Sequence, residues 1–317
     1  MKEHIHRGEF REQKKEPEVS GSIAIMPLKS TEKISHRAER RRRMLLLIMG
    51  SAPELNREIG SAADLVNVIS ELYKKYPKIG NSEFGWLEFN TQNPQESEQV
   101  AEQILLAYVD SFKDENIVNE IHVNATNGSS RIFIALGGKE ETRIPNEELS
   151  DSFQAHVHPG TVDLDDFSKF EKKVVFGLFN KKIEDRDIES LDLEKDKYVI
   201  ASRILSYLHL APSLEDIAKF SRPEDKGSEN IYGNFGHFKI NINKDAVPDF
   251  NAQAEEFDNR ERFIIGNLLA NANELFGENI NISLYPRDKY KELLNKQVYN
   301  LGTVKEILEK AKITVVT

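Results

Sequence analysis

The chain has 317 residues, a net charge of −10 and no cysteine. Without cysteine, disulfides, thiolate metal sites and cysteine nucleophiles are excluded, so any metal ligand must be His, Asp or Glu. The apolar runs of the sequence fall far short of the roughly 20 residues that a membrane helix needs, and the N-terminus is charged and polar. We therefore expect a cytoplasmic protein that does not enter a membrane.

Positive charge is concentrated at the start of the chain. Residues 1–43 contain 12 Lys and Arg against 7 Asp and Glu, whereas the remaining residues contain 31 against 46. Residues 1–34 show no sustained hydrophobic period, so we expect a disordered basic arm over 1–43, in which 22–28 could add one short strand. Such an arm could contact nucleic acid or an acidic partner, or it could simply be solvated.

The middle of the chain alternates between two hydrophobic periods. Apolar residues three and four apart indicate helices, one of which begins at a capping pattern formed by Ser61 and Asp64. Alternation with a period of two on both sides of an Asn-Gly-Ser-Ser turn indicates a hairpin. The predicted helices cover 35–50, 61–76, 95–112 and 163–179, and the predicted strands cover 84–89, 117–125, 131–136 and a short run that ends in two histidines.

The C-terminal part reads as a further α+β unit. Residues 181–196 are almost entirely polar and acidic, which indicates a linker, and 221–230 reads as a loop. We therefore expect an α+β fold, with a small mixed sheet and flanking helices over 44–180 and a C-terminal α+β unit over 197–317. After the linker, 198–210 is predicted to be a helix or a strand that passes into a helix. The other predicted elements are helices at 256–276 and near residues 289 and 304, and strands at 235–242, 279–285 and 313–316.

Two histidines one residue apart give the strongest chemical signal in the chain. In an extended strand, residues i and i+2 point to the same side, so His156 and His158 present their imidazoles together. A Pro-Gly break and a cluster of acids follow. Imidazoles with a nearby carboxylate suit zinc or a similar first-row metal. The alternative is a strand end at the surface, followed by a helix that Thr161 or Asp163 caps.

The order of elements around these histidines resembles the JAMM (MPN or JAB) metallopeptidase family, in which an upstream glutamate precedes His-x-His-Pro and then Ser-x-x-Asp. The resemblance covers residues 95–180 and implies that His156 and His158 bind zinc. It also implies that Ser168 helps to stabilise an oxyanion and that Glu120 acts on the catalytic water. Many members of this family cleave peptide bonds or isopeptide bonds to ubiquitin-like modifiers.

The third metal ligand and the base have more than one candidate. Glu171 stands where the family has its aspartate, and Asp166 is the other residue that we expect to bind the metal. The spacing between His158 and Ser168 is a residue or two longer than the family pattern, which keeps neighbouring acids open. The remaining alternatives are Asp163 and Asp165 for the ligand, and Glu115 and Glu83 for the base.

Two classes of function follow from these observations. The first is a metal-dependent peptidase or isopeptidase-like domain, either active or degenerate, with a protein or peptide as substrate. The second is a non-catalytic interaction or scaffold protein with a basic N-terminal arm. A separate pair, His237 and Lys239, lies on one face of a predicted strand and could supply an acid and a base, or could be exposed residues of an edge strand.

Overall fold

The computed structural model describes the protein in several stretches that share one sheet. The predicted α+β class, with a mixed sheet and flanking helices, is confirmed. Two predicted helices, at 35–50 and 256–276, lie outside the described residues. The helix predicted at 163–179 also lies outside them, except for Lys173, which is helical. The described residues are 19–24, 58–77, 79, 85–112, 119–138, 142, 153–158, 173, 193–210, 216, 228–243 and 277–317.

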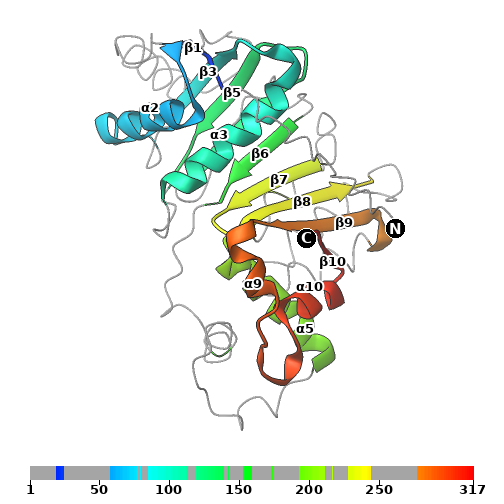
Figure 1. Ribbon diagram of the computed structural model, residues 1–317. Helices are drawn as coiled ribbons and strands as arrows, with labels where there is room; N and C mark the ends of the chain where they lie inside the picture. Colours follow the sequence, from blue (N-terminus) through cyan, green and yellow to red (C-terminus); the bar gives the residue numbers. More distant parts are fainter. Residues whose placement is uncertain are drawn as a thin grey trace, which may run out of the picture.

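Ten strands pair into a single sheet that extends through the described molecule (Figure 1). Their order across the sheet is β10-β9-β8-β7-β6-β4-β5-β3-β1-β2. The pairs β6–β7 and β9–β10 are parallel, and the other described pairs are antiparallel. The strands are β1 (Gly21–Ala24), β2 (Glu58–Ile59), β3 (Gly85–Thr91), β4 (Ile121–Ala125), β5 (Arg131–Leu136), β6 (Phe153–Val157), β7 (Ser228–Gly233), β8 (Gly236–Ile242), β9 (Ile280–Pro286) and β10 (Ile313–Val315).

The helices begin where the sequence offers capping side chains. The hydroxyl of Ser61 accepts from the backbone amide of Asp64, as the sequence predicts, and Thr303 forms a complete capping box with Glu306. The described α-helices are α2 (Ala62–Lys75), α3 (Ser97–Ser111), α5 (Leu193–Tyr207), α9 (Lys291–Leu294) and α10 (Val304–Lys310), and the 3₁₀ turns are η2 (Pro94–Glu96), η10 (Gly277–Asn279), η11 (Asp288–Tyr290) and η12 (Tyr299–Leu301).

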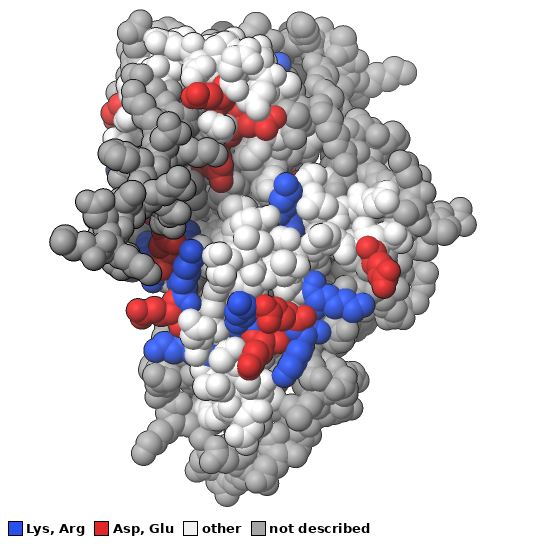
Figure 2. Space-filling view, turned by 45° about the vertical axis from the view of Figure 1, so that its right-hand side comes forward, with Lys and Arg blue, Asp and Glu red and all other residues white. Residues whose placement is uncertain are grey.

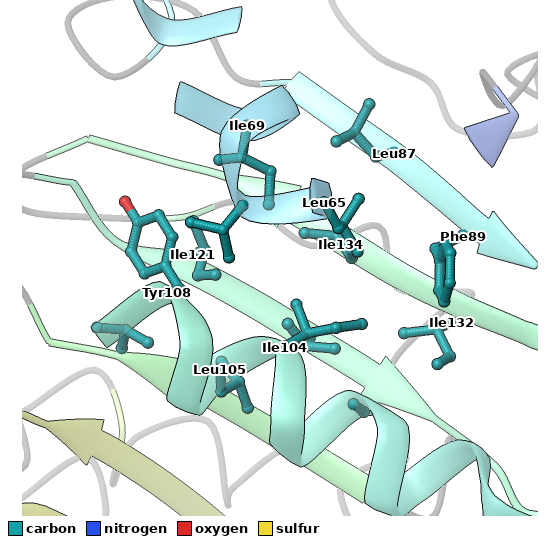
Figure 3. Packing of buried hydrophobic residues seen from close by; sticks show 14 of the residues in the cluster. Leu65, Ile69, Leu87, Phe89, Ile104, Leu105, Tyr108, Ile121, Ile132 and Ile134 are labelled. Atoms are coloured by element: carbon teal, nitrogen blue, oxygen red, sulfur yellow. The ribbon is translucent and has the colours of Figure 1, made fainter. Parts of the chain in front are cut away.

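Helices α2 and α3 cover one face of β3–β6. Alternate residues of these strands point towards the helices, and they form a buried aliphatic core with the inner faces of α2 and α3. Figure 3 shows Leu65 and Ile69 of α2 and Ile104 of α3 directed towards Ile134 and Leu87 of the sheet. Tyr232 of β7 joins the same core, and its hydroxyl donates to Glu102 Oε1 at 3.2 Å.

Helices α5, α9 and α10 cover the opposite face of the sheet, over β7–β10. Ile231 of β7 is registered with Phe238 of β8, and Phe238 with Leu284 of β9, so all three point to one side. They form a second buried core with α5 and α10. Because Tyr232 is packed under α3, its neighbour Ile231 must face the other way. The covering helices therefore change faces between the two halves of the sheet (Figure 1).

Three details differ from the expectations. The C-terminal strands do not form a sheet of their own but continue the first one, because β7 pairs with β6. Helix α5 begins at Leu193, so the last four residues of the predicted linker are helical. The end of the predicted loop, from Ser228, is strand β7. The short strand expected near residue 22 is confirmed as β1, which pairs with β2 and β3, so this part of the arm is ordered.

Within the described stretches, we find no helix with both the length and the hydrophobicity that a membrane span requires. Figure 2 shows acidic and basic side chains next to one another in the lower part of the face that it displays. This mixed pattern differs from the one-sided basic surface that nucleic acids favour. The predicted contact of the N-terminal arm with nucleic acid stays a prediction, since most of residues 1–43 lie outside the described part.

Candidate metal centre

The candidate site lies where β6 and β7 end side by side. Their parallel register pairs His156 with Ile231 and Val157 with Tyr232. The backbone amide of His158 extends this ladder by donating to the carbonyl oxygen of Tyr232 at 3.1 Å. Ligands commonly bind beyond the carboxyl ends of parallel strands, particularly where the topology changes. This end of β6 and β7 also marks the change of the helical cover.

His156 and His158 face the same side of the sheet, as their spacing predicts. Ala155 and Val157 point to the other side and pack in the core under α3. The centroids of the two imidazoles lie 4.7 Å apart, with an interplanar angle of 50°. The side chain of His156 is 2% exposed and that of His158 is 15% exposed. The pair is therefore accessible mainly at His158.

Asp216 brings a carboxylate to both histidines. Its Oδ1 lies 3.2 Å from His156 Nε2, and its Oδ2 lies 3.1 Å from His158 Nε2. Burial acts to raise the pKa of Asp216, but the charges of the two histidines and the hydrogen bond with His158 outweigh it and hold that pKa well below its usual range. The carboxylate is therefore ionised at neutral pH and lies between two imidazoles.

These three side chains have the spacing of ligands around one small cation. In a tetrahedral zinc site with bonds of about 2.0–2.1 Å, neighbouring donor atoms are about 3.3 Å apart. The separations of 3.1 and 3.2 Å are close to this value. In addition, His156 Nε2 is buried and makes no well-directed hydrogen bond, although Asp216 is near. These buried His and Asp groups could therefore hold a metal ion.

Glu229 holds His156 from the opposite edge of the ring. Its Oε1 lies 2.6 Å from His156 Nδ1, and the glutamate is fully buried. With Glu229 ionised, Nδ1 carries a proton and donates it to Oε1, so Nε2 is the nitrogen that would bind a metal ion. Such a carboxylate–histidine contact fixes the orientation and the tautomer of a metal-binding imidazole.

A second group of potential ligands consists of His122, His156 and Glu229. His122 is the cross-strand neighbour of His156, and the two rings stack with centroids 5.6 Å apart and an interplanar angle of 10°. The 2.6 Å between His156 Nδ1 and Glu229 Oε1 is much shorter than the about 3.3 Å between two ligand atoms on one zinc ion. It is the length of a short, charge-assisted hydrogen bond. We therefore assign this group to the support of His156.

Glu120 lies just before β4, and its carboxyl group interacts electrostatically with the three candidate ligands. Its backbone amide donates to the carbonyl oxygen of Gly138 at 2.7 Å, and its Oε1 accepts from the hydroxyl of Thr142 at 3.0 Å. Burial raises the pKa of Glu120, the charges of His156 and His158 lower it, and that of Asp216 raises it, so the net shift is upward. An acidic group with a raised pKa at such a site suits proton transfer.

The other predicted site residues lie outside the described residues. These are Ser168 as the oxyanion-stabilising residue and Asp166 and Glu171 as metal ligands. The alternatives Asp163 and Asp165, and the alternative bases Glu83 and Glu115, lie outside them as well. Among the predicted residues, the structure thus brings together His156, His158 and Glu120.

Asp216 and Glu229 are the site residues that the sequence analysis missed. For Asp216 a signal exists, because Ser213-Leu-Glu-Asp216 has the Ser-x-x-Asp spacing that the resemblance implies for 168–171. It stands 58 residues after His158, far beyond the interval that the family pattern suggests. Glu229 carries no such signal. It lies in a stretch that reads as a loop, and only the parallel pairing of β7 with β6 brings it to His156.

His209 ends helix α5 next to this site. Burial, followed by the charge of His158, lowers the pKa of His209 to about 4. The ring is therefore neutral near pH 7, with one nitrogen that donates and one that accepts. No sequence pattern marks this histidine, because it is a lone polar residue at a helix end.

The alternative pair, His237 and Lys239, does not belong to this site. Both residues point away from Phe238 and Ile240, which lie in the core under α5 and α10. His237 packs between two tyrosines, Tyr232 at 5.0 Å and Tyr285 at 4.4 Å between ring centroids. His156 and Ile231 face the opposite side of the sheet, so this pair cannot act together with the histidine pair.

Comparisons of the chain with protein-family models, with curated proteins and with solved structures found no match.

Proposed function

We propose that the protein is a zinc-dependent hydrolase that cleaves amide bonds of a protein or peptide, including isopeptide bonds. The observation that carries this proposal is the convergence of His156, His158 and Asp216, with Glu120 within electrostatic range. The set contains two imidazoles and one carboxylate, which is a common ligand set of catalytic zinc. It also matches, in residue types, the metal ligands and the base of the JAMM metallopeptidases that the sequence resembles.

The residues take the following roles. His156, His158 and Asp216 would hold the ion, and Glu229 would hold the proton of His156 on Nδ1, which leaves Nε2 to the ion. A zinc ion in such a site polarises a carbonyl group and lowers the pKa of water. Ser213, three residues before Asp216, takes the place of Ser168 as the candidate serine of the motif.

Glu120 would carry the proton in this reaction. Its Oε1 accepts from Thr142, so we assign Oε2 as the oxygen that accepts a proton from the attacking water. The water oxygen then forms a bond with the carbonyl carbon. Glu120 returns the proton to the leaving nitrogen as the carbon–nitrogen bond breaks, so that an acid and an amine are formed. A raised pKa helps the carboxyl group to act in both directions.

The test has two measurements on the same purified chain. We expect about one zinc per chain, and we expect the zinc-loaded protein to cleave a mixture of peptides and isopeptide-linked substrates. In Glu120→Gln, zinc binding should persist while cleavage falls by about 10²–10⁴-fold, the usual contribution of a positioned base. A chain that binds no metal, and whose stability is unchanged in His158→Ala, would contradict the proposal and support a non-catalytic interaction or scaffold protein.

A further inference from the structure

His209 occupies a backbone position that usually belongs to glycine. Helix α5 ends in a Schellman motif, in which the amide of Leu210 donates to the carbonyl oxygen of Leu205, and the amide of His209 to that of Ser206, each at 2.9 Å. His209 therefore has a left-handed backbone, with φ of 57°. This conformation is unfavourable for a residue with a Cβ atom, and glycine is the common choice.

The same turn is fixed against the end of β7, beside the histidine pair. A Cβ atom on Gly233 would lie 2.9 Å from the carbonyl oxygen of His209 and 3.1 Å from that of Leu208, so the backbone of this turn approaches the strand closely. Gly233 directly follows Tyr232, whose carbonyl oxygen accepts from the amide of His158. The last turn of α5 therefore contacts β7 at the residue directly after the one that pairs with His158.

The ring of His209 has a polar atom that the described protein does not satisfy. Its Nδ1 is buried and has no hydrogen-bond partner among the described residues. The ring also does not belong to either group of potential metal ligands in the described part of the chain. A buried, unpaired nitrogen is unfavourable. Together with the left-handed backbone, it is the kind of local cost that proteins tolerate at functional sites.

We propose that His209 is a substrate-contacting residue of the candidate metal site, which hydrogen-bonds a carbonyl-type group bound beside His158. Being outside the ligand set, the ring contributes to substrate binding and not to metal binding. Glycine would fit this backbone at a lower cost, and the ring is what histidine adds at this position. This inference rests on the proposed function, and the experiment separates the two.

The experiment measures zinc affinity, the affinity of the zinc-loaded protein for acetohydroxamate, and the thermal midpoint. Acetohydroxamate is a small carbonyl-containing probe that binds zinc. The variants are His209→Gly and His209→Asn, because both residues accept a left-handed backbone. His237→Asn is the matched control, since His237 is also a partly buried histidine whose pKa is lowered to about 4, on the opposite face of the sheet.

For both His209 variants we expect unchanged zinc affinity and a thermal midpoint that is equal or higher. Acetohydroxamate affinity should fall at least about tenfold, as the removal of a hydrogen bond of about 1.4 kcal/mol implies. The control should keep both affinities. Unchanged acetohydroxamate affinity in the His209 variants, with zinc bound, overturns the role of His209 alone. A parallel loss of zinc affinity overturns it too, because the ring would then be a ligand. A wild-type chain that binds no zinc overturns the proposed function and this inference together.

Discussion

The two halves of the sheet bury their apolar side chains on opposite faces. Under α2 and α3, strands β3–β6 direct one set of alternate residues into the first core. Under α5, α9 and α10, strands β7–β10 direct the opposite set into the second core. Strands β6 and β7 lie at the changeover and are joined in parallel. The candidate metal centre lies at this junction.

The change of covered face explains why polar residues are buried at the junction of the two halves. On β4 and β6, the face under α3 is aliphatic, whereas the other face carries buried polar side chains in place of a second aliphatic core. Buried polar groups are stable only where they are paired, so they require a specific arrangement of neighbours. The polar residues of this face are His122, Asn124, Gln154 and His156.

The largest expected effect concerns the two cores themselves. Phe89 lies in the first core and Phe238 in the second, and both are fully buried. Phe89→Ala and Phe238→Ala should each lower the free energy of unfolding by about 3–5 kcal/mol, because each leaves a cavity. Since one sheet connects the cores, we expect a single denaturant transition, shifted by either substitution. Two transitions, each shifted by only one variant, would show that the halves unfold independently.

The next-largest effect is a loss of zinc affinity that should occur for a substitution on one face of the sheet and not for one on the other. His158→Ala removes one of three candidate ligands, so zinc affinity should fall by more than about 100-fold, beyond the loss of an outer-sphere contact. His237→Ala, on the opposite face, should leave zinc affinity unchanged. Titration of the metal-free proteins in competition with a chelator measures both. Equal losses in the two variants would mean that the effect arises from general destabilisation.

A smaller loss of affinity is expected when the support of His156 is removed. Glu229→Ala should lower zinc affinity by about 10–100-fold, because the ring loses the partner that fixes its tautomer. Glu229→Gln retains an oxygen that accepts from Nδ1, so its loss should be smaller. The ¹⁵N shifts of His156 in the zinc-loaded protein should show a proton on Nδ1 in the wild type. An Nδ1 without a proton would contradict the role assigned to Glu229.

The smallest effect is the dependence of stability on Glu120. Because burial raises its pKa above the ordinary value of 4.5, ionisation destabilises the folded state. This penalty is absent below the unfolded pKa and grows as pH rises through the folded pKa. Metal-free Glu120→Gln should therefore be more stable than the wild type at neutral pH and equally stable below about pH 4. Denaturant unfolding at both pH values tests this, and a variant that is less stable at neutral pH contradicts it.

Much of the fold follows from local patterns. The period of three and four residues, with Ser61 as cap, identifies α2, and the Asn-Gly turn identifies the hairpin of β4 and β5. Strand β7 was missed because its first three residues, Ser228 to Asn230, are polar and resemble a loop. Their burial depends on pairing with β6, which lies far away in the sequence. A local pattern cannot report such a contact.

Separation along the sequence also explains which site residues could be predicted and which could not. His156 and His158 are two residues apart, so strand geometry alone places them together. Asp216 is 58 residues from His158, and Glu229 is 73 residues from His156. Their positions depend on how α5 and β7 pack against the first half of the sheet. Reading the Ser-x-x-Asp spacing without a limit on its distance would have suggested Asp216.

We propose that one metal site forms from His156, His158 and Asp216 where the helical cover changes faces. The most direct measurement is a zinc titration of Asp216→Asn and His122→Asn, which each alter one of the two groups that share His156. Asp216→Asn should lower zinc affinity by more than about 100-fold, and His122→Asn by less than about 10-fold. Zinc affinity that survives in Asp216→Asn and is lost in His122→Asn would contradict this assignment of the ligands.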